Sequence, residues 1–321
     1  MRVLVAGGAG YIGSVVTAAL VQSGHQVTVL DDLSTGHADA VPEGATLVRA
    51  SLHDSAPVLA DVRPEAVLHF AAKSLVGASQ VTPEDYWHTN VGGSLALLEA
   101  MRAADCRRIV FSSTAATYGE PDEVPISEDA PTRPTNTYGA SKLAVDHMLT
   151  SYAVAHSFAA VSLRYFNVAG AAYGCGERHA TETHVIPIAL QVAAGTRNAM
   201  TVFGEDYPTP DGTCIRDYVH VQDLAAAHLL ALPAPAPGEH RVYNLGNGTG
   251  FSVQEVVEAV RSVTGHTVPV VVGARRAGDP ARLVASSARI RADLGWAPEH
   301  TDLAGIVADA WEFAQARNTL V

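Results

Sequence analysis

The stretch Val3-Leu4-Val5-Ala6-Gly7-Gly8-Ala9-Gly10-Tyr11-Ile12-Gly13 leads from a short apolar run into a helical pattern that continues to Gln22. Its glycines at positions 7, 10 and 13 permit a tight turn, a close approach of the backbone to a pyrophosphate, and close packing of a helix against a sheet. The helix that follows supplies free N–H groups and the positive end of its dipole. Because a strand precedes the turn and a helix follows it, the pattern predicts a dinucleotide-binding site rather than an ordinary strand-to-helix connection.

The rest of the first half repeats this alternation of strands and helices. Short β-branched runs, typical of buried parallel strands, occur at residues 3–6, 27–30, 46–49, 66–70, 108–112 and 159–164, and helical patterns at 12–22, 84–104 and 138–155. This order predicts an α/β fold with a doubly wound parallel (Rossmann) sheet, whose ligands bind beyond the carboxyl ends of the strands. From about Ala171 the rhythm changes. We therefore expect a dinucleotide-binding domain over residues 1–170 and a smaller mixed α/β substrate domain over 171–321, with part of the chain able to cross back.

The composition excludes several classes of protein. The 321-residue chain has a formal net charge of −12, which argues against nucleic acid as a partner but not against a small anionic ligand in a local cluster of arginines. No apolar run reaches membrane-spanning length, and the early glycines interrupt the N-terminal run before it resembles a signal peptide. Cys106, Cys175 and Cys214 are an odd set without metal-ligand spacing, which predicts free thiols in a reducing cytoplasm. The fourteen histidines are scattered, with no pair at the one-turn spacing of a helical zinc site, so no metal site is expected.

The end of the second predicted strand selects the cofactor. Asp31 and Asp32 follow it, 18 residues beyond Gly13. A carboxylate there accepts hydrogen bonds from the ribose hydroxyls of NAD and repels the 2′-phosphate of NADP, which would require a nearby arginine. No arginine occurs from Asp31 through Val48. The sequence therefore predicts NAD.

A tyrosine and a lysine share one face of a predicted helix, in Tyr138-Gly139-Ala140-Ser141-Lys142. A phenol has a pKa of about 10, but an ammonium and the positive charge of oxidised nicotinamide both favour the phenolate. Lysine occurs only at positions 73 and 142, and a surface pair on the helix is the alternative reading. A compact ammonium suits a contact with both a ribose and a phenol better than a guanidinium does. Ser112-Ser113-Thr114, at the end of a predicted strand, offers a hydroxyl that could share the proton.

These residues belong to a wider resemblance that covers almost the whole chain. It includes Arg164-Tyr165-Phe166-Asn167, residues 203–213, Arg216-Asp217-Tyr218-Val219-His220-Val221, Tyr243-Asn244-Leu245-Gly246 and Arg276-Ala277-Gly278-Asp279. Together these segments resemble the UDP-glucose 4-epimerases, a branch of the extended short-chain dehydrogenase/reductase family. The resemblance implies epimerisation at C4 of a UDP-hexose through a transient 4-keto sugar, with Tyr138 as the base, Lys142 beside it, and NAD regenerated in each cycle. Thr114 stands where the family usually has serine.

The resemblance also implies binding residues. The implied NAD contacts are Gly7, Gly10, Tyr11, Ile12, Gly13, Asp31, Asp32, Leu33, Ser34, Thr35, Gly36, Ser51, Leu52, Phe70, Ala71, Ala72, Lys73, Asn90, Tyr138, Lys142 and Phe166. The implied substrate contacts are Thr114, Tyr138, Asn167, His184, Val185, Phe203, Arg216, Arg276, Asp279 and Leu283. Two guanidinium groups suit a pyrophosphate, although salt bridges to Asp217 or Asp279 are the alternative role for Arg216 and Arg276.

Four positions depart from the family pattern. Ser51 replaces an aspartate near the adenine, with Asp54 as the close substitute, and Lys73 falls one residue before the lysine of some relatives. His184 stands where an asparagine often meets the substrate. Leu283 occupies a gate position that is tyrosine in some relatives, so we expect UDP-GlcNAc and UDP-GalNAc to be accepted as well. Relatives often form homodimers through the two long helices, here expected at 84–104 and 138–155.

Other functions remain as alternatives. A 4,6-dehydratase needs an acid and a base after the hydroxyl residue, but Ala115 and Ala116 follow Thr114 and can supply neither. A UDP-glucuronate 4-epimerase or decarboxylase would differ mainly in how the C6 carboxylate is received. A non-catalytic NAD-sensing regulator on the same fold would have no need for the tyrosine, the lysine and the hydroxyl together.

Overall fold

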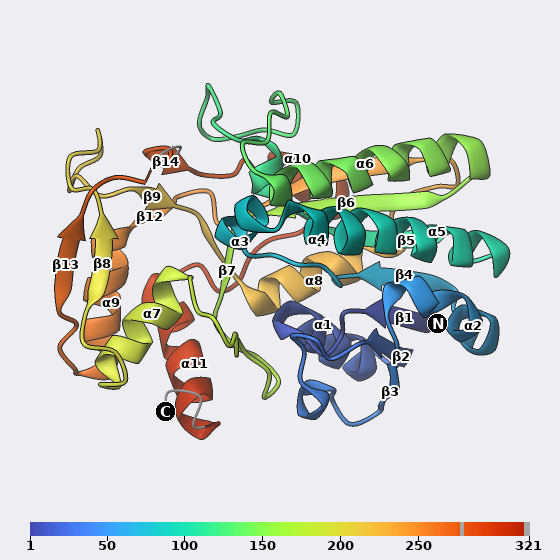
Figure 1. Cartoon of the computed structure of the whole chain (residues 1–321), viewed down its shortest axis with the longest axis horizontal. Coiled ribbons are helices and arrows are strands. Elements are labelled where there is room, and N and C mark those ends of the chain that lie inside the picture. The colour runs from blue at the N-terminus through green and yellow to red at the C-terminus, as the bar shows by residue number, and fades with distance from the viewer. Residues whose placement is uncertain (277–278, 318–321) are drawn as a thin grey trace.

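A computed structural model describes residues 1–276 and 279–317, and its largest element is a seven-stranded sheet (Figure 1). The strand order is β11-β6-β5-β4-β1-β2-β3, and every pairing in it is parallel. The strands are β1 (Arg2–Ala6), β2 (Gln26–Asp31), β3 (Ala45–Arg49), β4 (Ala66–His69), β5 (Arg108–Thr114), β6 (Ala159–Tyr165) and β11 (His240–Leu245). This arrangement confirms the predicted α/β Rossmann fold.

Helices cover both faces of this sheet. One apolar core contains side chains of α1 (Tyr11–Gln22) and α8 (Val221–Ala231), and a second contains side chains of α2 (Ser55–Val62), α5 (Gly93–Ala103) and α6 (Thr137–His156). All residues of β4 and β6 are buried. Because such strands face helices on both sides, their sequences are mostly apolar, and the exceptions His69, Ser162 and Arg164 are buried polar side chains.

The helix expected over residues 84–104 is not regular. It comprises α4 (Pro83–Tyr86), a π-helical turn over Trp87–Gly92, and α5. Within the π turn, the side chain of the buried Asn90 bonds to the backbone N–H and C=O of Lys73, at 2.8 and 3.0 Å. A single π turn commonly marks a functional site. The predicted helical stretch is therefore present over residues 83–103, with a π turn inside it.

The second half of the chain builds a smaller region and then crosses back. Its helices are α7 (Val185–Ala193), α9 (Val253–Thr264) and α11 (Leu303–Ala316), which share a third apolar core. Its short strands are β7 (Asn167–Ala169), β8 (Met200–Phe203), β9 (Ile215–Arg216), β10 (Tyr218–His220), β12 (Phe251–Ser252), β13 (Val270–Gly273) and β14 (Arg282–Leu283). After β10, the chain returns to the large sheet through α8 and β11, so this sheet takes its seventh strand from the second half.

Two short helices complete the elements used below: α3 (Val76–Val81), before α4, and α10 (Ala288–Leu294), which packs near β11. Among the helices of the described residues, none is both long and apolar enough to span a membrane.

Candidate active site

The glycine turn after β1 has the shape expected of a pyrophosphate cradle. Gly7 has a φ of +82°, and its N–H bonds to the carbonyl of Leu30 at 2.8 Å. A Cβ atom on Gly13 would overlap the carbonyl oxygen of Gly7, so only glycine fits where α1 meets the turn. The N-cap of α1 is Gly10, which offers no side chain to its first N–H groups. Free N–H groups at a helix N-terminus bind phosphate oxygens, so the cradle fits the diphosphate of NAD.

Asp31 braces this turn from the end of β2. Its carboxylate accepts hydrogen bonds from the N–H groups of Ala9 and Leu33, both at 2.9 Å. Burial raises the pKa of Asp31 despite these bonds. Both oxygens keep further lone pairs, so the carboxylate can order the loop and still accept a ribose hydroxyl. Asp32 is exposed and bonds to the N–H of Ser34 at 2.8 Å.

The remaining predicted cofactor residues lie on segments at the same carboxyl edge of the sheet. Residues 33–36 follow β2, residues 51–52 follow β3, residues 70–73 follow β4, and Phe166 follows β6. The Ser51 hydroxyl donates to the Asp54 carboxylate at 2.8 Å, so Asp54 lies next to the position where Ser51 replaces the aspartate of relatives. The Lys73 ammonium is exposed and forms a salt bridge with Asp85 at 3.2 Å. Leu52 is buried in the apolar core beside α5. Their contacts with NAD remain predictions.

The start of α6 lies directly against the end of β5. Asn136 caps the helix by accepting a hydrogen bond from the N–H of Gly139 at 2.8 Å. A Cβ atom on Gly139 would overlap the carbonyl of Ala116, so glycine permits this close approach. As a result, the phenol of Tyr138 lies near the hydroxyl of Thr114, which acts to lower the pKa of that phenol. The structure therefore brings these two predicted catalytic residues together.

Lys142 is buried one turn further along α6. Its side chain is 2% exposed, and its ammonium donates to the carbonyl of Ser112 at 2.8 Å and lies 4.7 Å from the centre of the Phe111 ring. Burial lowers the pKa of Lys142 to about 7, although the nearby Asp146 opposes that shift. The alternative of a pair on the helix surface is therefore wrong.

The protein alone does not lower the pKa of the catalytic phenol. Burial raises the pKa of Tyr138 to about 12, which outweighs the opposing effect of the bond to Thr114. The predicted stabilisation of the phenolate rests on positive charge from Lys142 and from oxidised nicotinamide together, and it stays a prediction.

Buried polar contacts hold this part of the site in place. Asp146 on α6 forms a salt bridge with Arg164 on β6 at 2.8 Å, and both side chains are at most 7% exposed. Ser113 donates to the same carboxylate at 3.2 Å. Asn90 donates to the hydroxyl of Ser141 at 2.9 Å, which ties the π turn to α6. Sequence reasoning missed these positioning contacts because their partners lie far apart in the chain.

The predicted substrate residues of the second half gather around β9. Arg216 and Leu283 face each other in register between β9 and β14. The guanidinium of Arg216 lies 3.4 Å from the carboxylate of Asp279, and that of Arg276 lies 3.9 Å from the centre of the Phe203 ring. The alternative salt bridge of Arg216 is thus present with Asp279. Ala277 and Gly278, which complete the Arg276 motif, lie outside the described residues.

Two other predicted contacts have different surroundings. Asn167 donates from its side chain to the carbonyl of Asp217 at 3.0 Å, and Asp217 itself is fully buried and accepts three backbone N–H bonds. His184 is the N-cap residue of α7, directly before Val185. It belongs to a cluster with Glu177, His179 and Glu182 that sequence reasoning missed, because these residues lie in an irregular segment without helical spacing.

Comparison with known proteins agrees with this geometry. Residues 3–246 match the NAD dependent epimerase/dehydratase family. The chain belongs to that family. A protein from Streptomyces lividans named UDP-glucose 4-epimerase is 59% identical over 97% of this chain and 95% of its own length. Another UDP-glucose 4-epimerase, from Corynebacterium glutamicum, is 57% identical over 98% of this chain and 96% of its own length.

A solved structure shares the fold over its whole length. It is a UDP-glucose 4-epimerase from Bifidobacterium longum in complex with NAD+ and UDP, and it matches with a TM-score of 0.94 and 34% identity, covering 100% of both chains. The cradle, the buried lysine and the tyrosine–threonine pair of this chain are thus features of an NAD-dependent epimerase/dehydratase family member.

Proposed function

We propose that this chain epimerises UDP-hexoses at C4, interconverting UDP-glucose and UDP-galactose. The observation that carries the proposal is the closeness of Tyr138 and Thr114 beside a buried Lys142, at the sheet edge that carries the dinucleotide cradle. The relatives named above are UDP-glucose 4-epimerases, so neither the glucuronate-specific enzymes nor a non-catalytic regulator is favoured.

The roles of the residues follow from their contacts. NAD, held by the turn of residues 7–13 and by Asp31, would supply reversible hydride transfer at C4 of the sugar. Tyr138 accepts the proton of the sugar hydroxyl and later returns it, while Thr114 hydrogen-bonds to the same oxygen. Lys142 brings its charge to the phenol when ligands draw the ammonium away from Ser112. Arg216, Arg276 and Phe203 hold the uridine diphosphate, which suits two guanidinium groups and an aromatic ring.

We also propose how this function is distributed over the chain. Residues 1–170, together with the returning segment of α8 and β11, hold NAD, and the rest of 171–321 holds the sugar nucleotide. The three cysteines are free, which supports a reducing cytoplasm as the location. Leu283 in place of a larger gate residue leaves room for an N-acetyl group, so UDP-GlcNAc and UDP-GalNAc are additional substrates. The chain forms a homodimer through α5 and α6.

The test is to incubate the purified protein with UDP-galactose, without added NAD, and to measure UDP-glucose by chromatography. We expect conversion by the native protein. In Tyr138→Phe, conversion is expected to fall by at least ~10³-fold, because the proton acceptor is lost. The bound NAD, released by denaturation and quantified, should stay at the native level. Failure of the native protein to convert UDP-galactose even with NAD added would contradict the proposed function.

A further inference from the structure

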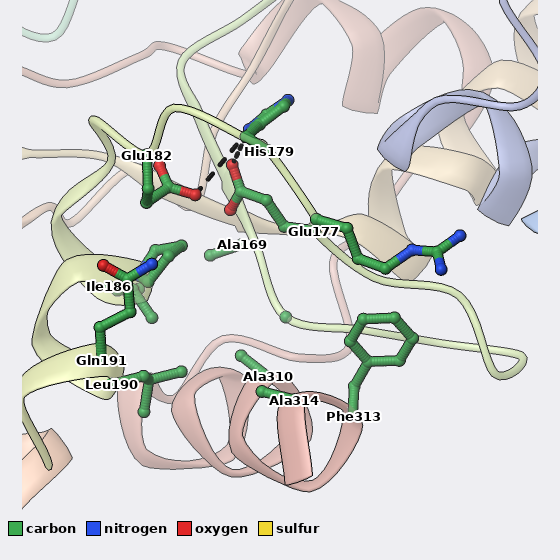
Figure 2. Close-up of a pocket in the computed structure, with 13 residues that line it drawn as sticks. Ala169, Glu177, His179, Glu182, Ile186, Leu190, Gln191, Ala310, Phe313 and Ala314 are labelled. Atoms are coloured by element: carbon green, nitrogen blue, oxygen red, sulfur yellow. Dashed lines mark ion pairs between the residues drawn. The ribbon is translucent and has the colours of Figure 1, made fainter. Parts of the chain in front are cut away.

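Four side chains that are able to bind a metal converge in the irregular segment between β7 and α7. Glu177, His179, Glu182 and His184 each place one ligand atom within 4.8 Å of the others. Figure 2 shows Glu177 and Glu182 directed toward His179, on the side of the pocket away from α11. The side chains of Glu177 and Glu182 are only 10% and 6% exposed. Two carboxylates so far removed from water require a compensating positive charge.

Hydrogen bonds account for only part of this cluster. The Oε1 atom of Glu182 accepts bonds from the backbone N–H groups of Thr183 and His184, both at 2.7 Å, and the two carboxylates raise the pKa of His184 to about 10 despite its burial. The Nδ1 atoms of His179 and His184 both lie 2.8 Å from the same Oε1 atom of Glu177. The Nδ1 of His184 also lies 2.8 Å from Oε1 of Glu182, yet a ring nitrogen carries at most one hydrogen. The Nδ1 of His179 is buried and has no hydrogen bond of acceptable geometry. A cation between these atoms would satisfy all four groups.

We propose that Glu177, His179, Glu182 and His184 form a structural binding site for Zn²⁺. Zinc prefers imidazole nitrogen, thiolate and carboxylate ligands in a tetrahedron, with bonds of about 2.0 to 2.2 Å. Such bonds place neighbouring ligand atoms about 3.4 Å apart, so zinc would separate by about 0.6 Å the three imidazole–carboxylate pairs that lie at 2.8 Å here, while the fourth pair lies at 3.9 Å. Because the protein supplies all four ligands, no position remains for water, as is typical of structural rather than catalytic zinc.

The ion would fix the segment that connects the two halves of the molecule. At its start, the carbonyl of Gly170 accepts a bond from the Tyr11 hydroxyl at 2.6 Å. In its middle, Arg178 pairs with Asp39 at 2.9 Å. At its end, His184 caps α7. This step rests on the proposed function. If zinc binds Nδ1 of His184, then Nε2 of the same ring stays available to hydrogen-bond to the diphosphate of the substrate.

The test measures metal in the full chain, purified without a histidine tag. After dialysis against zinc and then against metal-free buffer, elemental analysis should find about one zinc per chain. His179→Ala and Glu182→Gln should each retain less than about a tenth of that amount, because a lost ligand weakens a four-ligand site. The matched control is His266→Ala, an exposed histidine outside the cluster, which should keep native zinc content.

A second measurement needs no variant. Protein stripped by a chelator and refilled with Co²⁺ should show the strong visible absorption of tetrahedral cobalt, and zinc should raise the Tm of the stripped protein. Native protein that retains no zinc, or variants that retain as much as the native chain, would overturn the proposal and leave a hydrogen-bonded cluster of histidine and glutamate. Because these measurements use no substrate, their outcome does not depend on whether the protein epimerises UDP-hexoses.

Discussion

The chemistry of single residues depends here on burial. Burial raises the pKa of the Tyr138 phenol to about 12 and lowers the pKa of the Lys142 ammonium to about 7. Both shifts disfavour charge. On the proposed function, positive charge from the Lys142 ammonium and from oxidised nicotinamide would offset this effect and favour the phenolate.

Leu283 offers a test of substrate range at the scale of one side chain. It lies beside Arg216, where a tyrosine would occupy the space expected for a 2-N-acetyl group. Leu283→Tyr should lower kcat/KM for UDP-GalNAc by at least ~10-fold, about 1.4 kcal/mol, with little change for UDP-galactose. Parallel kinetics with the two substrates check this. Absence of UDP-GalNAc turnover in the native protein, beside rapid UDP-galactose conversion, would refute the expected range.

The turn between β1 and α1 carries a prediction at the scale of an element. A Cβ atom at position 13 would overlap the carbonyl of Gly7 and push α1 away from the cradle. Gly13→Ala should therefore purify with less than about a tenth of the native NAD content, because the N–H groups at the start of α1 would no longer point at the diphosphate. Gly77→Ala in α3 is the matched control, because an added Cβ there meets open space. Equal NAD content in Gly13→Ala and Gly77→Ala would contradict this account of the turn.

Helix α8 carries a prediction about pH. Burial lowers the pKa of His228 from 6.5 to about 4, despite a bond to the carbonyl of Leu224. Between those two values the unfolded chain binds a proton that the folded chain does not, so the free energy of unfolding falls as the pH drops from 6.5 toward 4. Replacement by glutamine, His228→Gln, should shrink the difference in Tm between about pH 7.5 and about pH 5. An unchanged difference would show that another group causes the acid sensitivity.

At the scale of the whole molecule, α5 and α6 each expose a large apolar side chain. They run side by side in Figure 1, and Leu95 and Val154 on them are 44% and 80% exposed. A second copy that covers this surface would remove these side chains from water. Leu95→Glu should shift the mass measured by light scattering from dimer to monomer. Val271→Glu, at an exposed position on β13, should not. A native monomer would contradict the proposed homodimer.

Prediction from sequence succeeded where the signal is local. The turn of residues 7–13, the carboxylate after β2 and the Tyr138–Lys142 pair each lie within one or two turns of chain, so their patterns are readable. The seventh strand was missed because β11 joins β6 across 80 residues of chain, as in the pairing of Ala160 with His240, and no local pattern encodes that pairing. The cluster around Glu177 was missed for a related reason, since an irregular loop brings its ligands together. The π turn at Asn90 depends on bonds to two distant segments.

The return of the chain to form β11 has a consequence for synthesis on the ribosome. β6 is complete at Tyr165, but its outer neighbour ends only at Leu245 of the 321 residues. Until then, a growing polypeptide carries a largely apolar strand with one unsatisfied row of N–H and C=O groups, which invites association with other nascent chains. About three-quarters of the chain must therefore be synthesised before the edge of β6 is paired. We expect chaperones to bind the nascent chain most strongly during that interval.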